Sequence, residues 1–99
     1  GYSNGANLLG AVILLHPGLV RRAILLRGIA VLDEPPSPDL GGTEVLLLSG
    51  ARDPFARMAP ALEQALRGSG AALMVQTLPA GHELSDADIE LARGWMSAA

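Results

Sequence analysis

The chain has no cysteine and no lysine, and these absences remove several classes of function. Without cysteine there are no disulfides, no thiolate metal sites and no cysteine nucleophile. Without lysine there is no phosphate-binding loop of the Walker type. The formal net charge is −3 and no basic patch stands out, which argues against a nucleic-acid partner. The sequence therefore directs attention to serine, histidine and carboxylate chemistry.

Long apolar runs are also missing. No run approaches the roughly 20 residues that a membrane-spanning helix needs, and no basic segment followed by an apolar stretch marks a signal peptide. We therefore expect a cytoplasmic protein without a membrane span. The apolar content is nonetheless high for 99 residues, at 49%. This composition suits one small domain whose strands are covered on both faces.

Three helices are expected from apolar periodicity and from start and stop signals. The first spans residues 4–16, and because it is apolar nearly all round we expect it to be buried. The second begins near Pro60 and ends at residues 68–70, which include two glycines. The third is capped by Ser85, with Asp88 three residues later in the position of a capping-box partner.

Three strands are expected between these helices. They are short, continuous apolar runs within residues 22–32, at 44–49 and at 72–78. A proline-rich loop occupies residues 33–42. Strands that alternate with helices imply right-handed crossovers and a parallel sheet. The predicted fold class is therefore α/β, with a parallel sheet of three strands flanked by three helices.

Residues 1–5 (GYSNG) carry the motif G-x-S-x-G, which places Ser3 on a nucleophile elbow. A nucleophilic serine of this kind stands on a sharp turn between a strand and a helix. The strained backbone of that turn requires small residues two positions before and two positions after the serine. A lone match is a weak signal, and by itself Ser3 is more simply interpreted as an ordinary helix N-cap.

Two further reactive groups follow predicted strands. Asp53 follows the strand at 44–49, and His82 follows the strand at 72–78. Because the carboxyl ends of parallel strands share one edge of a sheet, we expect Ser3, Asp53 and His82 to converge there. His82 would take the proton of Ser3, and Asp53 would orient and stabilise the imidazole. The backbone N–H of Asn4 would supply one oxyanion donor.

Each of these residues has a simpler interpretation. Asp53 precedes a proline and could be a turn residue, and His82 could be an ordinary loop histidine. His16 competes with His82, but its place at the end of a helix favours a structural role. No pair of histidine and carboxylate residues has helical metal-ligand spacing, so no metal site is expected. Four other aspartates compete with Asp53 in the loop and in the last helix: Asp33, Asp39, Asp86 and Asp88.

Three segments together resemble the phospholipase/carboxylesterase family of α/β hydrolases, which includes acyl-protein thioesterases and small bacterial carboxylesterases. The segments are residues 1–7 (GYSNGAN), 50–54 (GARDP) and 79–84 (PAGHEL). The resemblance covers the whole chain but only the C-terminal half of such an enzyme. It implies a single partial α/β-hydrolase domain over residues 1–99, without the N-terminal strands and without the loop that carries the second oxyanion donor. It also implies esterase or thioesterase activity on small or medium acyl chains, with no cofactor.

Two hypotheses follow. The first is a serine hydrolase that acts on a small-molecule ester through Ser3, Asp53 and His82. The second is a non-catalytic fragment or subunit that docks to a complementary N-terminal half or associates with itself, because a sheet that ends beside its nucleophile strand exposes an apolar edge. Side chains expected near the pocket are mixed apolar and basic, and they leave the acyl specificity open: Arg27, Phe55 and Met58.

Overall fold

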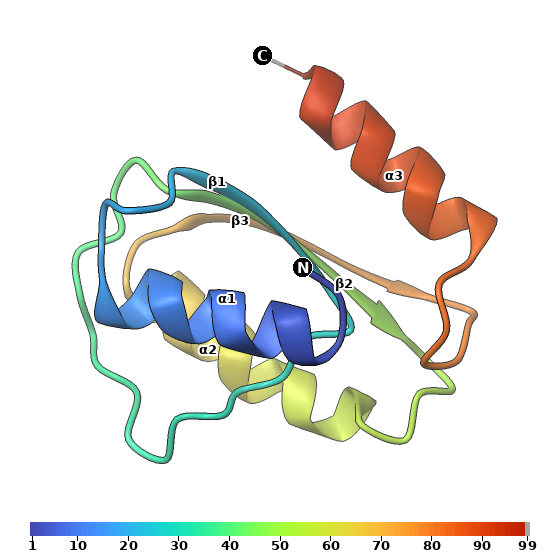
Figure 1. The fold of residues 1–99 in the computed structure, drawn as a ribbon, viewed down its shortest axis with the longest axis horizontal. Helices are drawn as coiled ribbons and strands as arrows, with labels where there is room; N and C mark the ends of the chain where they lie inside the picture. The colour runs from blue at the N-terminus through green and yellow to red at the C-terminus, as the bar shows by residue number, and fades with distance from the viewer. Residues whose placement is uncertain (99) are drawn as a thin grey trace.

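The computed structural model describes residues 1–98 and has the expected α/β architecture (Figure 1). The three predicted strands and three predicted helices are confirmed, and a short 3-10 helix, η1, leads into the second α-helix. In chain order the elements are α1 (Asn4–Leu15), β1 (Arg22–Leu26), β2 (Glu44–Gly50), η1 (Ala56–Met58), α2 (Ala59–Gly68), β3 (Ala72–Leu78) and α3 (Asp86–Ser97).

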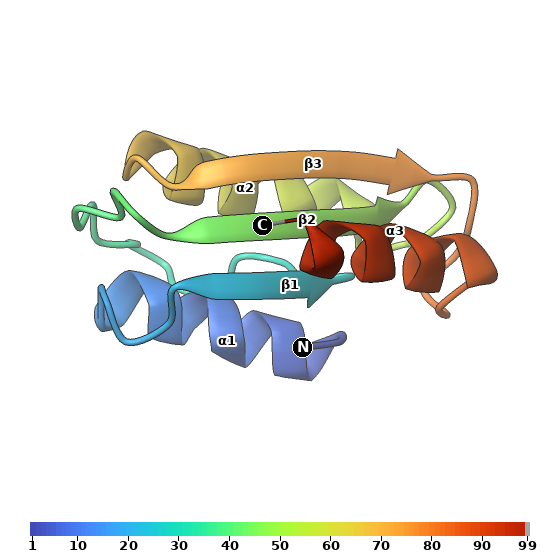
Figure 2. The same cartoon turned by 90° about the horizontal axis from the view of Figure 1, so that it is seen from above.

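The sheet has the order β1-β2-β3, and all three strands are parallel. Helices α1 and α2 cover one face of the sheet, and α3 lies over the other face (Figures 1 and 2). The central strand β2 is buried at every position from 45 to 50. This is the pattern expected of a parallel strand that is covered on both sides.

The main core lies between the sheet and helices α1 and α2. The helical spacing of Leu62 and Leu66 puts both side chains on the face of α2 that meets the sheet, and both are fully buried. Each such side chain contributes about 1.5–3 kcal/mol when it is removed from water. The other buried members of this cluster come from α1, β1, β2 and the loop before β2: Ala6, Ile13, Leu14, Ala23, Leu25, Leu40, Val45 and Leu47.

Helix α1 is only partly buried, so the expectation of a fully buried helix is wrong for the described part of the chain. Ile13 and Leu14 face the core, but Leu8 is 67% exposed and Leu15 is 53% exposed. The reason is the position of α1 at the side of the sheet that β1 borders, where residues 1–98 place nothing over its outer face. The apolar pattern of α1 thus exceeds the cover that these residues provide.

The segment before α1 continues the sheet beyond β1. The Leu26 N–H donates to the Gly1 carbonyl (2.9 Å), and the Ser3 N–H donates to the Leu26 carbonyl (2.8 Å). Tyr2 forms a parallel bridge with Leu26. Residues 1–3 therefore occupy the place of the carboxyl end of a fourth parallel strand, which brings Ser3 to the edge of the sheet where β2 and β3 also end.

None of the helices formed by residues 1–98 has both the length and the apolar character needed to cross a membrane.

Candidate active site

Ser3 stands in a strained backbone conformation between the strand-like segment and α1. Its φ is 55° and its ψ is −120°, in a region that residues with a side chain rarely adopt. Such a conformation costs about 1–3 kcal/mol and persists only where the surroundings impose it. Here the hydrogen bond to Leu26 fixes one side, and the Gly5 N–H donates to the Tyr2 carbonyl (2.9 Å) across the turn. This is the sharp strand-to-helix turn that the motif predicts.

The two glycines of the motif are under different constraints. A Cβ atom on Gly1 would lie 2.7 Å from the Gly5 carbonyl carbon and oxygen, so a side chain at position 1 would collide with backbone. A Cβ atom on Gly5 would meet no atom within 4 Å among the described residues. Position 1, two residues before the serine, therefore needs glycine, as the motif predicts. At position 5, two residues after the serine, residues 1–98 leave room for a larger side chain.

The structure brings Ser3, His82 and Asp53 together as a hydrogen-bonded chain. Ser3 Oγ lies 2.8 Å from His82 Nε2, and His82 Nδ1 lies 2.9 Å from Asp53 Oδ2. In the arrangement that satisfies both bonds, the serine hydroxyl donates to Nε2 and the Nδ1–H donates to the carboxylate. Residues that lie 79 and 29 positions apart in sequence thus meet at one sheet edge.

The Asp53 carboxylate is held in its anionic form. Burial by itself would raise the pKa of Asp53, but hydrogen bonds from the Phe55 N–H and the His82 ring outweigh that effect, and the nearby charge of Arg27 adds to them. The net result lowers the pKa of Asp53 below its ordinary value. The Asp53 side chain is 3% exposed and that of His82 is 31% exposed, so water and substrate reach the imidazole but not the carboxylate behind it.

Two aromatic rings flank the imidazole of His82. The Tyr2 ring lies tilted with its centroid 5.6 Å away, and the Phe55 ring lies edge-on at 5.5 Å. The Tyr2 hydroxyl donates to the His82 backbone carbonyl (3.0 Å). These contacts restrict both the ring and the backbone of His82.

A hollow of about 220 Å³ opens beside the three residues. Asn4 is the first residue of α1, so its N–H has no acceptor within the helix and is free to donate at this hollow. Phe55 lines the hollow as expected, whereas Met58 is not among the residues that form it. The complete lining is Ser3, Asn4, Asn7, Arg27, Ile29, Phe55 and His82.

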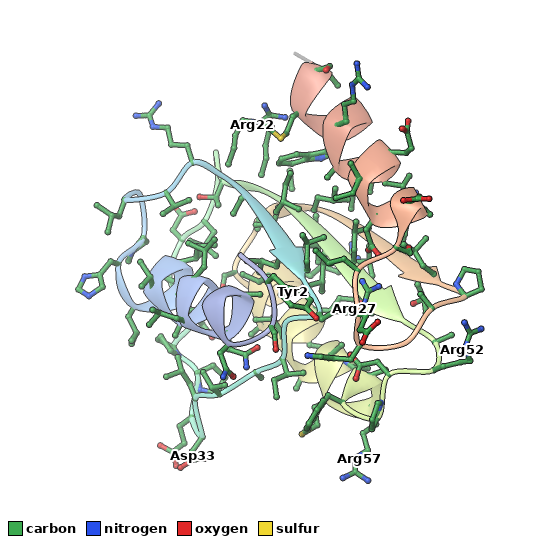
Figure 3. The ribbon with its side chains drawn as sticks, turned by 45° about the vertical axis from the view of Figure 1, so that its right-hand side comes forward. Tyr2, Arg22, Arg27, Asp33, Arg52 and Arg57 are labelled. Atoms are coloured by element: carbon green, nitrogen blue, oxygen red, sulfur yellow. The ribbon has the colours of Figure 1, made fainter. Side chains whose placement is uncertain are left out.

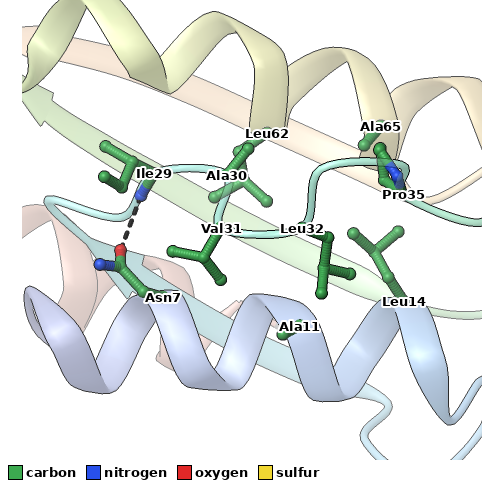
Figure 4. Close-up of a pocket in the computed structure, with 10 residues that line it drawn as sticks. All are labelled: Asn7, Ala11, Leu14, Ile29, Ala30, Val31, Leu32, Pro35, Leu62 and Ala65. Atoms are coloured by element: carbon green, nitrogen blue, oxygen red, sulfur yellow. Dashed lines mark hydrogen bonds between the residues drawn. The ribbon is translucent and has the colours of Figure 1, made fainter.

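A second hollow lies between α1, α2 and the loop of residues 29–35 (Figure 4), and it shares Asn7 and Ile29 with the first. The Ile29 N–H donates to Asn7 Oδ1 (2.8 Å), which ties this loop to α1. The volume of the second hollow is about 10 Å³. Since a single water needs about that much room, this hollow is a packing feature and not a substrate site.

The competing residues lie elsewhere. His16 is the C-cap of α1, about 20 Å along the helix axis from Ser3 by the rise of 13 residues. Asp39 accepts the Gly41 N–H in its own loop (2.9 Å). Asp88 does form the predicted capping box with Ser85, but it is fully buried and also pairs with Arg27, which the sequence did not suggest.

Arg27 lies at the hollow, as expected. Its side chain is completely buried and is paired with Asp88 through bonds of 2.7 and 2.8 Å. The position of Arg27, but not its partner, has a sequence signal, because Arg27 directly follows β1 and so lies at the same sheet edge as the other site residues. Within residues 1–98, no three histidine, aspartate or glutamate side chains are grouped closely enough to hold a metal ion.

The Arg27–Asp88 pair has a testable effect on stability. Burial alone would raise the pKa of Asp88, but hydrogen bonds from Arg27 and Ser85 lower it below its ordinary value. A lowered pKa in the folded state stabilises the protein fully above the unfolded value of about 3.9, and this contribution is lost as the pH falls through the folded value. We expect Asp88→Asn to lower the free energy of unfolding by about 3–5 kcal/mol at pH 7.

The same change should matter less in acid, because below about pH 4 the unfolded chain binds a proton at Asp88 that the folded chain, with its lowered pKa, binds less readily. Denaturant unfolding of both proteins at pH 7 and pH 3 measures the difference. Asp39→Asn is the matched control, since Asp39 is exposed and makes one hydrogen bond in a loop. The interpretation is contradicted if Asp88→Asn lowers the free energy of unfolding by the same amount at pH 7 and at pH 3.

The chain is similar to known hydrolases. No protein-family model matches the chain. MhqD of Bacillus subtilis strain 168, whose name assigns it provisionally to the hydrolases, is 32% identical over 97 residues. The match covers 96% of this chain and 48% of MhqD.

Two solved carboxylesterases have the same fold over nearly the whole chain. The carboxylesterase of Mesorhizobium loti is 43% identical with a TM-score of 0.94, over 100% of this chain and 48% of its own. The carboxylesterase of Bacillus cereus is 25% identical with a TM-score of 0.90, and the match covers 96% of this chain and 46% of that enzyme. The chain thus spans about half the length of the relatives it matches. The expected similarity to half of an α/β-hydrolase carboxylesterase is confirmed, and a C-terminal half fits it.

Proposed function

We propose that this chain carries the catalytic residues of a serine hydrolase that cleaves esters or thioesters of small or medium acyl chains through an acyl-enzyme. The observation that carries the proposal is the continuous hydrogen-bonded path from Ser3 Oγ through His82 to Asp53. The strain at Ser3 and the similarity to carboxylesterases support it. In this proposal residues 1–99 form a single partial α/β-hydrolase domain.

The first half of the reaction forms the acyl-enzyme. Ser3 Oγ attacks the ester carbonyl carbon while its proton passes to His82 Nε2. Asp53 stabilises the imidazolium that forms, and the Asn4 N–H stabilises the negative charge that develops on the carbonyl oxygen. When the tetrahedral intermediate collapses, His82 gives the proton to the leaving group, which is the oxygen of an alcohol or the sulfur of a thiol.

The second half returns the enzyme to its starting state. A water molecule donates a proton to His82 Nε2 and attacks the acyl carbon, and Ser3 leaves with that proton. A second oxyanion donor is expected from outside residues 1–98, in the loop that the family places after an earlier strand. Its absence would lower the rate by about 10²–10³-fold, which is the usual effect of removing one donor.

The hollow favours a neutral, compact acyl group. Its volume of about 220 Å³ lies below the 300–1,000 Å³ typical of sites for drug-sized ligands. Ile29 and Phe55 supply apolar wall. Arg27 also lines the hollow, but its side chain is shielded from solvent, and four of its five N–H donors are already bonded to protein oxygens. A substrate with an anionic acyl group therefore gains little from it.

A second candidate function is a non-catalytic fragment or subunit that docks to a complementary half. The observation in its favour is the incomplete outer side of the molecule. Residues 1–3 provide the only pairing of the outer edge of β1 within residues 1–98, and Leu8 of α1 is 67% exposed. The fact that the chain spans about half of each relative agrees with this candidate.

Asp53→Asn tests the proposed function. We expect kcat for a p-nitrophenyl ester to fall about 10⁴-fold, because an amide at this position favours the wrong tautomer of His82. The isosteric change leaves the fold intact, as circular dichroism would show. Asp39→Asn removes a charge at an exposed loop position and should leave kcat unchanged. Equal and measurable rates for Asp53→Asn and the unchanged protein, in the chain alone or in the chimera described below, would rule out the assigned role.

The two candidate functions are separated by a chimera. The chain replaces the matching half of the Mesorhizobium loti carboxylesterase, which is 43% identical to it. A folded chimera that hydrolyses the ester in an Asp53-dependent way supports the hydrolase. A folded chimera without hydrolysis supports the non-catalytic subunit.

A further inference from the structure

Arg27 is the buried basic residue of the described chain, and it lies directly below the catalytic histidine loop. It follows β1 in a left-handed conformation with φ 57°, and its N–H donates to the Leu48 carbonyl of β2 (2.8 Å). This backbone turn directs the side chain into the space between the sheet edge and the start of α3, close to Tyr2 (Figure 3). Its guanidinium is entirely shielded from solvent.

The guanidinium binds the loop on both sides of His82. Arg27 Nε donates to the Gly81 carbonyl (2.9 Å), and Nη2 donates to the Glu83 carbonyl (3.1 Å). The carbonyl between them, that of His82 itself, accepts the Tyr2 hydroxyl (3.0 Å). Three consecutive carbonyls of a loop without regular secondary structure are thus held by two side chains from the opposite side of the site.

Asp88 fixes the guanidinium from behind. Its two oxygens accept Arg27 Nη1 and Nη2 at 2.7 and 2.8 Å, which is a bidentate pairing. Asp88 Oδ2 also accepts the N–H and the hydroxyl of Ser85 (2.8 and 2.9 Å), which caps α3. The charge of Arg27 is therefore neutralised locally, and its orientation is set by a helix that contributes no atom to the hollow.

We propose that Arg27 is a positioning residue that sets the place of His82 Nε2 relative to Ser3 Oγ. The inference rests on the proposed function, since it concerns the base of that reaction. The planar fork of Arg27 reaches two carbonyls and one carboxylate at once, which the single ammonium group of a lysine cannot reproduce. The role belongs to the fork geometry and not to the positive charge.

The test compares Arg27→Met and Arg27→Lys in the chimera with the Mesorhizobium loti carboxylesterase. We expect kcat to fall about 10²-fold in Arg27→Met with KM nearly unchanged, because a displacement of about 1 Å in a catalytic group has an effect of that size. Arg27→Lys keeps the charge, and we expect its kcat to fall at least about tenfold. Arg52→Met is the matched control, because Arg52 is exposed near the same edge and its side chain makes no hydrogen bond among the described residues.

A second readout follows His82 without reference to activity. The His82 Nδ1 proton bonded to Asp53 should give a downfield proton NMR signal, which we expect Arg27→Met to lose and Ser3→Ala and Arg52→Met to keep. Loss of the signal and of kcat together supports the proposal. A signal and kcat that are unchanged in folded Arg27→Met overturn it, as does full activity in Arg27→Lys.

The two readouts separate this inference from the proposed function. A chimera that never hydrolyses esters, but whose His82 signal depends on Arg27, contradicts the function and supports the positioning role. If Arg27→Met does not fold, Arg27→Met/Asp88→Asn removes the unpaired buried carboxylate and is measured in the same way. Tyr2→Phe removes only the hydrogen bond to the His82 carbonyl, and we expect a smaller fall in kcat in the same direction.

Discussion

Replacement of Ser3 with alanine is expected to lower kcat for ester hydrolysis by about 10⁴–10⁶-fold, to the level that binding and the oxyanion donor give alone. The expectation follows from the 2.8 Å contact between Ser3 Oγ and His82 Nε2, which gives this hydroxyl a base in line with its proton. The variant should fold, because Ser3 makes no hydrogen bond through its side chain to the helix it precedes. Steady-state hydrolysis of a p-nitrophenyl ester is the measurement.

The control for Ser3→Ala is another serine change without a base nearby. Ser37 lies exposed in the proline-rich loop, and Ser37→Ala should leave kcat unchanged. Hydrolysis that survives in Ser3→Ala would show that the ester is cleaved by another group, such as water activated by His82 without an acyl-enzyme.

The second large effect is expected from Gly50→Ala. Gly50 ends β2, and a Cβ atom there would lie 2.3 Å from the Gly81 carbonyl oxygen and 2.6 Å from that of Ala80. Both atoms belong to the backbone of the loop that carries His82, so the loop must move. Because Gly81 is also bound by Arg27 Nε, the movement breaks this contact as well. We expect kcat to fall at least about 10²-fold and the free energy of unfolding to fall by about 1–3 kcal/mol.

Gly94→Ala provides the matched control for this change. Gly94 lies within α3, where a Cβ atom would meet nothing within 4 Å among the described residues. Alanine there should raise helix stability by up to about 1 kcal/mol and leave kcat unchanged. Thermal unfolding and ester hydrolysis of both variants measure the two effects. A Gly50→Ala variant with the activity of Gly94→Ala would contradict the close approach of the loop.

The strands and helices were predictable because each has a strong local signal. Continuous apolar runs mark β1, β2 and β3, and the cap at Ser85 marks the start of α3. The meeting of Asp53 with His82 was predictable from topology alone, because parallel strands bring their carboxyl ends to one edge. The catalytic roles of these residues stay predictions until they are tested.

The support around His82 was not predictable in the same way. Arg27 has no periodic pattern, and its partners are the carbonyls of Gly81 and Glu83, which carry no signal in the sequence. Asp88 has a local signal for capping, and this signal conceals its long-range pairing with Arg27, which lies 61 residues away. Contacts to backbone atoms and contacts between distant side chains depend on the folded path of the chain.

The exposed residues of α1 show that an apolar sequence pattern does not by itself predict which sides of a helix are covered. The pattern of α1 predicts cover on all sides, whereas residues 1–98 cover only the side with Ile13 and Leu14. Leu8 and Leu15 remain exposed, and within residues 1–98 only residues 1–3 pair with the outer edge of β1. These features agree with a complementary half or self-association as the means of covering that side.

The most direct test of the central claim is covalent labelling with a serine-directed fluorophosphonate. The chain alone and the chimera are each assayed for p-nitrophenyl ester hydrolysis, treated with the probe, digested and mapped by mass spectrometry. If Ser3 is the nucleophile, the form that hydrolyses the ester carries one adduct on Ser3, labelling abolishes turnover, and His82→Ala prevents labelling. An active form that carries the adduct on another serine, or that keeps its turnover with Ser3 labelled, would show that Ser3 is not the nucleophile.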